Sequence, residues 1–153
     1  MKTKMLILLA SVCGAFLLGG GVVLAGPPIG FNSKILSDGK IATATHISAN
    51  GIEFSSQKNA RVIVQASEFA PGGTSGWHTH PGLTVVTVVE GSVTEHRGCA
   101  AGVTYTKGQS FVEPPSTPGD VDNASATVPA HVIAVLIVPD GMAPRTNVDA
   151  PAC

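Results

Sequence analysis

Two histidines separated by one residue, His78 and His80, are the residues whose type and spacing best suit metal chemistry in this sequence. On an extended backbone, side chains alternate between the two faces of a strand, so residues at i and i+2 point the same way. Both imidazoles can then reach one ion. The spacing alone is weak evidence, because five histidines in 153 residues produce such a pair by chance in roughly one such chain in six.

The residues around the pair favour an extended strand. A Pro71-Gly72-Gly73 turn precedes the histidines, and a Val-rich segment, 83–90, follows them. If the alternation continues through this segment, three further side chains share the face of the histidines: Thr84, Val86 and Val88. We therefore expect a face that is polar where the strand begins and apolar further along.

Short β-branched segments separated by turn residues continue along the chain. We predict strands over 60–69, 83–90, 92–97, 103–106, 110–113 and 131–138, an arm over 26–33, and one or two weak strands within 34–48. Gly91 is expected to join the second and third of the six as a hairpin. No amphipathic helix of convincing length is present, so the pattern predicts an all-β sandwich or barrel.

The composition of the chain argues against one class of partner, nucleic acids. The formal net charge is −1, only 12% of residues are charged, and no cluster of Lys and Arg interleaves with aromatic residues. Nothing here would neutralise a phosphate backbone, so we expect no nucleic-acid partner.

The N-terminus differs from the rest of the chain. Lys2 and Lys4 precede an almost wholly apolar stretch, 5–24, and Ala25 is a small residue suited to a signal-peptidase site. We predict a cleaved signal peptide over 1–25, which leaves a secreted or periplasmic protein with no stable membrane insertion. The alternative is a retained anchor, because about 20 apolar residues can span a bilayer.

Export affects how the cysteines are interpreted. The mature chain would hold Cys99 and Cys153, an even pair in an oxidising compartment, and a disulfide between them is the simplest inference. It would pin the tail, 141–153, to the barrel. The alternative is two free thiols.

The ordered positions of these residues resemble the motifs of the cupin superfamily. The first motif, G-x5-H-x-H-x3,4-E-x6-G, is matched by Gly72, His78, His80, Thr84 and Gly91, with Thr84 in the place of the family glutamate. The second, G-x5-P-x-G-x2-H-x3-N, is matched by Gly108, Pro114 and Asn123, with Ser116 in the place of its second glycine and Gly119 in the place of its histidine. The segment 105–114 looks like small exported bacterial cupins, in which cysteines near positions 99 and 153 also occur.

The resemblance implies a single antiparallel β-barrel, the double-stranded β-helix or jelly-roll of cupins. The expected organisation is a signal peptide (1–25), an N-terminal arm with flanking strands (26–59), the cupin barrel (60–140) and a C-terminal tail (141–153). Cupins that bind Fe, Mn, Ni or Zn use three His and one Glu, of which this chain keeps two. A tight catalytic metal site is therefore less expected than the fold alone would suggest.

Other residues are candidates to complete the ligand set. Besides Thr84 they are Glu113, Asp120, Asp122 and His131. The ordinary expectation for the three carboxylates is a solvated loop position, because Asp and Glu are mostly exposed unless paired. His131 belongs to the last predicted strand, which borders the barrel interior in many cupins.

Three functions follow as hypotheses. The favoured one is an exported binding protein whose barrel accepts a small molecule or a weakly held divalent metal through His78 and His80. The second is a metal-dependent enzyme of the dioxygenase or isomerase type that uses both histidines and a substitute carboxylate. The third is a structural role, with a homodimer formed by pairing of edge strands.

Overall fold

The described part of the chain is built from β-strands. The computed structural model describes residues 26–153, so the predicted signal peptide lies outside the described residues. Within that range, no helix has the length and apolar character needed to cross a membrane. The strands are β1 (Ile29–Lys40), β2 (Thr45–Ala49), β3 (Ile52–Ser56), β4 (Arg61–Thr74), β5 (His78–Thr79), β6 (Leu83–Glu90), β7 (Ser92–Arg97), β8 (Val103–Thr106), β9 (Ser110–Glu113), β10 (Gly119–Asp122), β11 (Ala130–Val138) and β12 (Thr146–Asn147).

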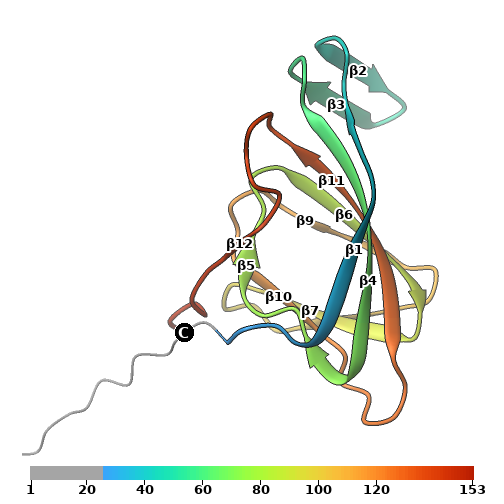
Figure 1. Ribbon diagram of the computed structural model, residues 1–153, viewed down its shortest axis with the longest axis vertical. Helices are drawn as coiled ribbons and strands as arrows, with labels where there is room; N and C mark the ends of the chain where they lie inside the picture. The colour runs from blue at the N-terminus through green and yellow to red at the C-terminus, as the bar shows by residue number, and fades with distance from the viewer. Residues whose placement is uncertain (1–25) are drawn as a thin grey trace, which may run out of the picture.

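Ten of these strands form one antiparallel sheet that curls into a nearly closed barrel (Figure 1). One wall has the order β1-β4-β11-β6-β9, and the other contains β12, β5, β10, β7 and β8. The walls meet where Thr74 of β4 pairs with Asp122 of β10. The predicted single antiparallel β-barrel is therefore confirmed.

The core lies between the two walls and follows the period of two along the strands. In β11, every second residue is buried, from Ala130 to Val138, and in β6 the same alternation buries Val86 and Val88. Burial of each Val or Leu side chain contributes about 1.5–3 kcal/mol. Alternating apolar residues of these strands thus line the interior between the two walls.

The predicted hairpin at Gly91 does not form. β6 pairs with β11 and β9, whereas β7 pairs with β10 and β8, so the two strands belong to opposite walls. The chain does change direction at Gly91, which has a φ of 73°, and a Cβ there would lie 2.5 Å from the carbonyl oxygen of Pro129. The turn at Gly91 was predicted correctly. The pairing of β6 with β7 was wrong, because each of these strands pairs with other strands of the barrel.

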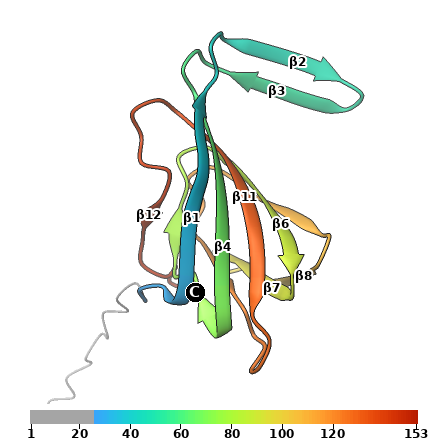
Figure 2. The same ribbon diagram turned by 45° about the vertical axis from the view of Figure 1, so that its right-hand side comes forward.

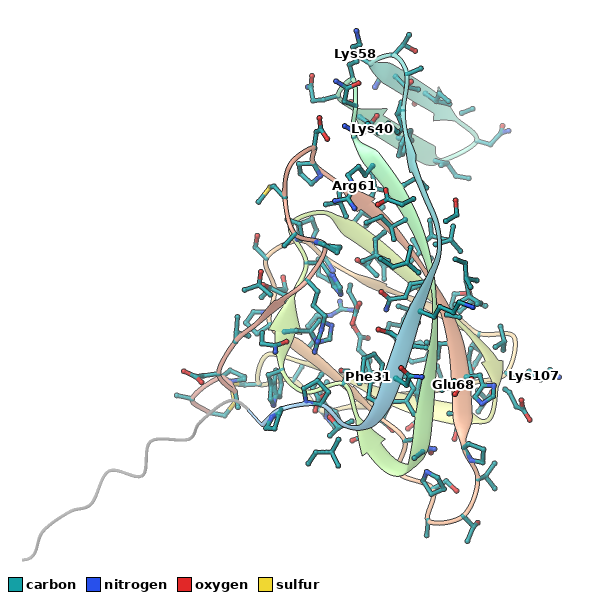
Figure 3. All side chains as sticks on the ribbon, in the orientation of Figure 1. Phe31, Lys40, Lys58, Arg61, Glu68 and Lys107 are labelled. Atoms are coloured by element: carbon teal, nitrogen blue, oxygen red, sulfur yellow. A yellow bond between two sulfur atoms is a disulfide. The ribbon has the colours of Figure 1, made fainter. Side chains whose placement is uncertain are left out.

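The N-terminal region also differs from expectation. β1 begins at Ile29, inside the segment predicted to be an arm, and pairs with β4 from Phe31↔Phe69 to Lys40↔Arg61. Its side chains are almost all exposed, so it lacks the apolar alternation by which strands are recognised. β2 and β3 form a separate hairpin that projects beyond the barrel (Figure 2). Lys58 lies between β3 and β4, where the hairpin rejoins the barrel strands, and Phe31 lies at the barrel (Figure 3).

The C-terminal tail returns to the barrel and is held there at two points. β12 pairs with β5 through Thr146↔Thr79 and Asn147↔His78. Cys99 and Cys153 form the predicted disulfide, 54 residues apart in sequence. The tail therefore runs past the histidine segment.

Candidate metal centre

His78 and His80 lie together at the entrance to the barrel interior. His78 begins the short strand β5, where it pairs with Gly119 of β10. The centroids of the two imidazole rings are 4.9 Å apart at an interplanar angle of 88°. Both side chains are buried, at 5% and 8% exposed. The predicted alternation holds across Pro81 and Gly82, because Thr84 and Val86 line the same cavity as the histidines.

A backbone carbonyl fixes the orientation of each imidazole. Nδ1 of His78 lies 2.8 Å from the carbonyl oxygen of Gly76, and Nδ1 of His80 lies 2.6 Å from that of Pro144. A carbonyl only accepts hydrogen bonds, so each Nδ1 must carry the proton and each neutral ring presents a bare Nε2. Metal-binding histidines are commonly oriented in this way.

Glu113 completes a cluster with the two histidines. Its Oε1 lies 3.9 Å from Nε2 of His78, and its Oε2 lies 3.2 Å from Nε2 of His80. The side chain is buried at 9% exposed, which corrects the expectation of a solvated loop carboxylate. β9 places it there, because Glu113 pairs with Thr84 of β6. The carboxylate absent from position 84 is therefore supplied from the neighbouring strand.

The electrostatics of the cluster are compatible with a bound cation. Burial lowers the pKa of His78 below 6.5, and this effect exceeds the opposing attraction of Glu113. With its Nδ1 protonated, a neutral His80 would point a lone pair at a carboxylate oxygen 3.2 Å away, which is repulsive unless a proton or metal ion lies there. The three ligand atoms lie within 4.8 Å of one another. Two imidazoles and one carboxylate suit divalent transition metals, so this cluster could hold such an ion.

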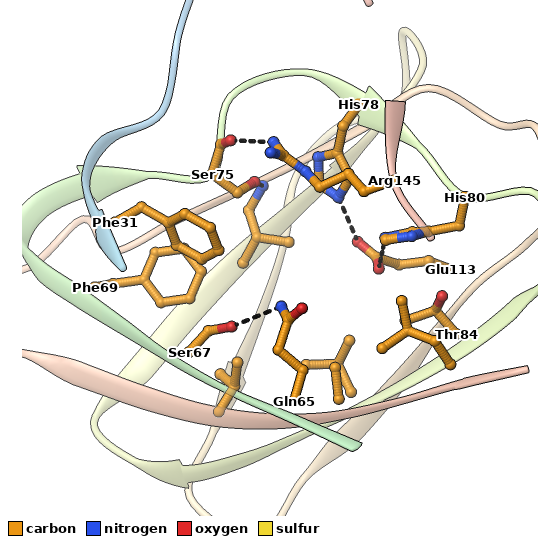
Figure 4. A pocket seen from close by; sticks show the side chains of 15 residues that line it. Phe31, Gln65, Ser67, Phe69, Ser75, His78, His80, Thr84, Glu113 and Arg145 are labelled. Atoms are coloured by element: carbon orange, nitrogen blue, oxygen red, sulfur yellow. Dashed lines mark hydrogen bonds and ion pairs between the residues drawn. The ribbon is translucent and has the colours of Figure 1, made fainter. Parts of the chain in front are cut away.

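The cluster faces a small cavity inside the barrel, drawn in Figure 4. Its volume is about 50 Å³, enough for roughly three to five water-sized groups. Apart from the cluster, the lining is mainly apolar, with a few polar groups, including Gln65 and Ser67. Two residues that line this space, Thr84 and Arg145, each have a buried polar atom, Oγ1 and Nε, with no hydrogen-bond partner in the described part of the chain. Leaving such a group unsatisfied costs about 1–3 kcal/mol.

Arg145 was not anticipated from the sequence. It belongs to the tail, and one guanidinium nitrogen donates to the carbonyl oxygens of Ser75 at 2.5 Å and Gly76 at 3.4 Å. Its guanidinium carbon lies 5.9 Å from the centroid of the Phe31 ring. The sequence signal available was that Arg145 is the only basic residue in the segment 141–153. Only the path of the tail shows that this residue reaches the cavity.

The other candidate ligands are engaged elsewhere. Asp120 accepts hydrogen bonds from the hydroxyls of Thr74 at 2.7 Å and Ser75 at 3.0 Å. Asp122 pairs with His96 at 2.9 Å. His131 is a partly exposed strand residue 3.5 Å from Glu90. The structure does not bring these candidates into the cluster, and Thr84 adjoins it as an uncharged cavity residue.

A second, smaller hollow lies on the other side of the histidines. It has a volume of about 10 Å³, close to the space that one water molecule needs. Glu95 lines it and is buried at 5% exposed, with its carboxylate paired to Arg97 at 2.5 Å. This pair balances its own charge and leaves Glu113 as the carboxylate within the cluster.

Comparison with known proteins agrees with this architecture. Residues 66–136 match the Cupin domain family. No curated protein matches the chain in sequence. A cupin-like protein from Thermotoga maritima shares the fold with 20% identity and a TM-score of 0.52, over 58% of this chain and 65% of that one.

Two further solved structures cover more of this chain. A cupin-2 domain protein from Rhodospirillum rubrum aligns with 15% identity and a TM-score of 0.55, over 80% of this chain and 68% of that one. A DMSP lyase from Ruegeria pomeroyi, DddQ, aligns with 12% identity and a TM-score of 0.54, over 77% of this chain and 51% of the lyase. The chain thus spans less than two thirds of the Thermotoga and Ruegeria proteins. At these identities the likeness concerns the fold. The domain match and the shared fold together show that residues 66–136 of this chain form a Cupin domain.

Proposed function

We propose that this chain is an exported cupin-domain protein that binds a divalent transition metal ion through His78, His80 and Glu113, beside a cavity that accepts a small molecule. The observation that carries the proposal is the convergence of the three ligand atoms within 4.8 Å. The carbonyl partners of both Nδ1 atoms support it, because they leave both Nε2 atoms free to bind.

The three ligand residues should bind a metal ion with moderate affinity. Two neutral imidazoles and one carboxylate provide three ligands and a single negative charge, which fits Fe, Mn, Ni or Zn. Position 119, where the family has a further histidine, is glycine in this chain. We therefore expect weaker binding than in a four-ligand cupin site.

A metal-dependent enzyme of the dioxygenase or isomerase type is the second candidate. The favouring observation is that His78, His80 and Glu113 all line the cavity, so a molecule held there would adjoin the ion. A bound ion would supply Lewis-acid chemistry and open coordination positions. The chain's own contribution is to hold both imidazoles in one tautomer and to surround the site with a largely apolar lining.

Export remains part of the proposal. Its support is the basic start and apolar stretch of residues 1–25, together with the disulfide between Cys99 and Cys153, a bond typical of oxidising compartments.

Metal analysis of the untagged protein tests the metal site. After incubation with Mn²⁺ or Zn²⁺ and removal of excess, we expect close to one ion per chain in the wild type. The His78→Ala/His80→Ala variant should retain almost none. A matched control, His46→Ala/His131→Ala, removes two histidines outside the cluster and should load like the wild type. Absence of metal from the wild type, or equal metal in both double variants, would refute the site.

A second measurement separates the two candidate functions. A metal-dependent dioxygenase should consume oxygen when the Fe²⁺-loaded protein meets a substrate, and an isomerase should change the substrate's NMR spectrum or optical rotation at unchanged mass, without consuming oxygen. A binding protein should instead be stabilised against heat by its ligand without changing it.

A further inference from the structure

The cavity contains a buried hydrogen-bond donor that lacks an acceptor. Arg145 Nε is shielded from solvent and has no hydrogen-bond partner among the described residues, 26–153. An arginine side chain has donors only and stays charged in proteins, so the missing group must be an acceptor. Buried polar groups are nearly always satisfied, which makes this exception informative.

The guanidinium of Arg145 is held in place by the rest of the structure. One of its terminal nitrogens is bonded to the carbonyl oxygens of Ser75 and Gly76. The adjoining residue, Thr146, pairs with Thr79 in β5. The unpaired Nε is therefore part of an ordered arrangement that lines the cavity (Figure 4).

The charges around the cavity favour an anion once an ion occupies the cluster. Glu113 and Asp120 are the carboxylates whose charges act on Arg145, and Glu95 is neutralised by Arg97. A divalent ion and Arg145 together outweigh the negative charges of Glu113 and Asp120, which leaves a net positive charge. A low-dielectric enclosure strengthens the attraction of that charge for an anion.

We propose that the cavity binds a small carboxylate, one oxygen of which accepts a hydrogen bond from Arg145 Nε. The proposal rests on the proposed function for the ion beside it. The unpartnered hydroxyl of Thr84 is available to a second polar group of the same ligand. The volume of about 50 Å³ suits a ligand of roughly the size of acetate or lactate, and the planar guanidinium suits a planar carboxylate.

Paired probes of equal size test the charge requirement. Acetate and lactate are compared with their neutral amides, acetamide and lactamide, by calorimetry and thermal unfolding of the Mn²⁺-loaded, untagged protein. We expect the carboxylates to bind and to raise the melting temperature, and the amides to do neither. Equal responses to acids and amides would overturn the proposal, as would binding of inorganic phosphate in preference to both acids.

Variants locate the carboxylate. Arg145→Met should weaken binding of the bound acid roughly 10- to 100-fold, the usual effect of losing a charge-assisted hydrogen bond, with unchanged Mn²⁺ content. Arg145→Lys should recover part of the loss. Lys107→Met is the control, because Lys107 is an exposed cation in the turn between β8 and β9 and should not matter for the acids. Undiminished acid binding by a folded Arg145→Met protein contradicts the inference.

The outcomes for metal and carboxylate are separable. If the protein holds Mn²⁺ but binds neither acid, the carboxylate inference fails and the metal site stands. If no metal binds and acetate still binds in an Arg145-dependent way, the metal proposal fails and the carboxylate site stands.

Discussion

Thr84 and Glu113 are directly opposite each other in the pairing of β6 with β9. Opposed residues in an antiparallel pair have Cβ atoms about 4.5–5.5 Å apart, so their side chains occupy neighbouring space on one face. A carboxylate moved from one strand to its partner can therefore reach almost the same point. This relationship explains how the cluster retains a negative charge although position 84 is threonine.

The first prediction concerns the charge of Glu113. Glu113→Gln keeps the shape of the side chain and removes the anionic ligand, so metal affinity should fall by at least the roughly 10- to 100-fold associated with lesser changes at metal sites. Calorimetric titration with Mn²⁺ or Zn²⁺ measures this. The exchange variant Thr84→Glu/Glu113→Thr should recover much of the affinity, and failure of the folded exchange variant to exceed Glu113→Gln would contradict the cross-strand interpretation.

The second prediction adds a ligand at position 119. Gly119 pairs with His78, and a Cβ at Gly119 would lie 3.9 Å from Glu113 Oε1 and 3.5 Å from the carbonyl oxygen of His96. A Cβ atom there meets only ordinary van der Waals contacts, so a side chain would begin beside the cluster. Gly119→His should tighten Mn²⁺ or Zn²⁺ binding about tenfold or more, because a further imidazole joins the ligand set. Gly119→Ala is the control and should leave affinity unchanged; equal affinities for the two variants would show that position 119 does not reach the ion.

The third prediction is a pH dependence of stability. Burial lowers the pKa of His78, so below pH 6.5 the unfolded chain takes up a proton that the folded protein still excludes. The unfolded state then binds more protons, and the free energy of unfolding should decrease as pH falls from about 6.5 toward the lowered pKa. Denaturant unfolding between pH 7.5 and 5, with a chelator present, measures the slope.

A neutral replacement tests whether His78 is the source. His78→Gln should show a shallower decrease over this range, whereas His131→Gln, which changes a partly exposed histidine, should follow the wild type. If His78→Gln and the wild type lose stability in parallel, the pH dependence arises elsewhere.

The fourth prediction concerns the bond between Cys99 and Cys153. Closing a loop over a separation of 54 residues contributes about 4 kcal/mol in the chain-entropy description. Cys99→Ala/Cys153→Ala should lower the free energy of unfolding by up to this amount, measured by urea denaturation. Addition of a reductant should destabilise the wild type and leave the double variant unaffected; a wild type that is indifferent to the reductant would contradict a stabilising role.

The sequence was most informative where local patterns determine structure. The His78 and His80 spacing, the alternation through Thr84 and Val86, and the family motifs predicted the barrel and its polar face. The sequence named Glu113 as a candidate ligand but could not favour it over Asp120 and Asp122. Its position in the cluster depends on the register between β9 and β6. No local pattern encodes that register.

Two other features lay beyond sequence reasoning for related reasons. β1 has mostly exposed side chains and is stabilised by backbone pairing with β4, so apolar periodicity does not identify it. Arg145 reaches the cavity through the pairing of β12 with β5. Both depend on contacts between segments far apart in the chain.

The C-terminal tail connects the candidate metal centre with the disulfide bond. Pro144 orients His80, and Cys153 ties this segment to the barrel. If oxidation of the thiols tightens metal binding by some factor, thermodynamic reciprocity requires metal binding to favour the oxidised pair by the same factor. In that case, occupancy of the centre shifts the midpoint potential of Cys99 and Cys153 to a more negative value.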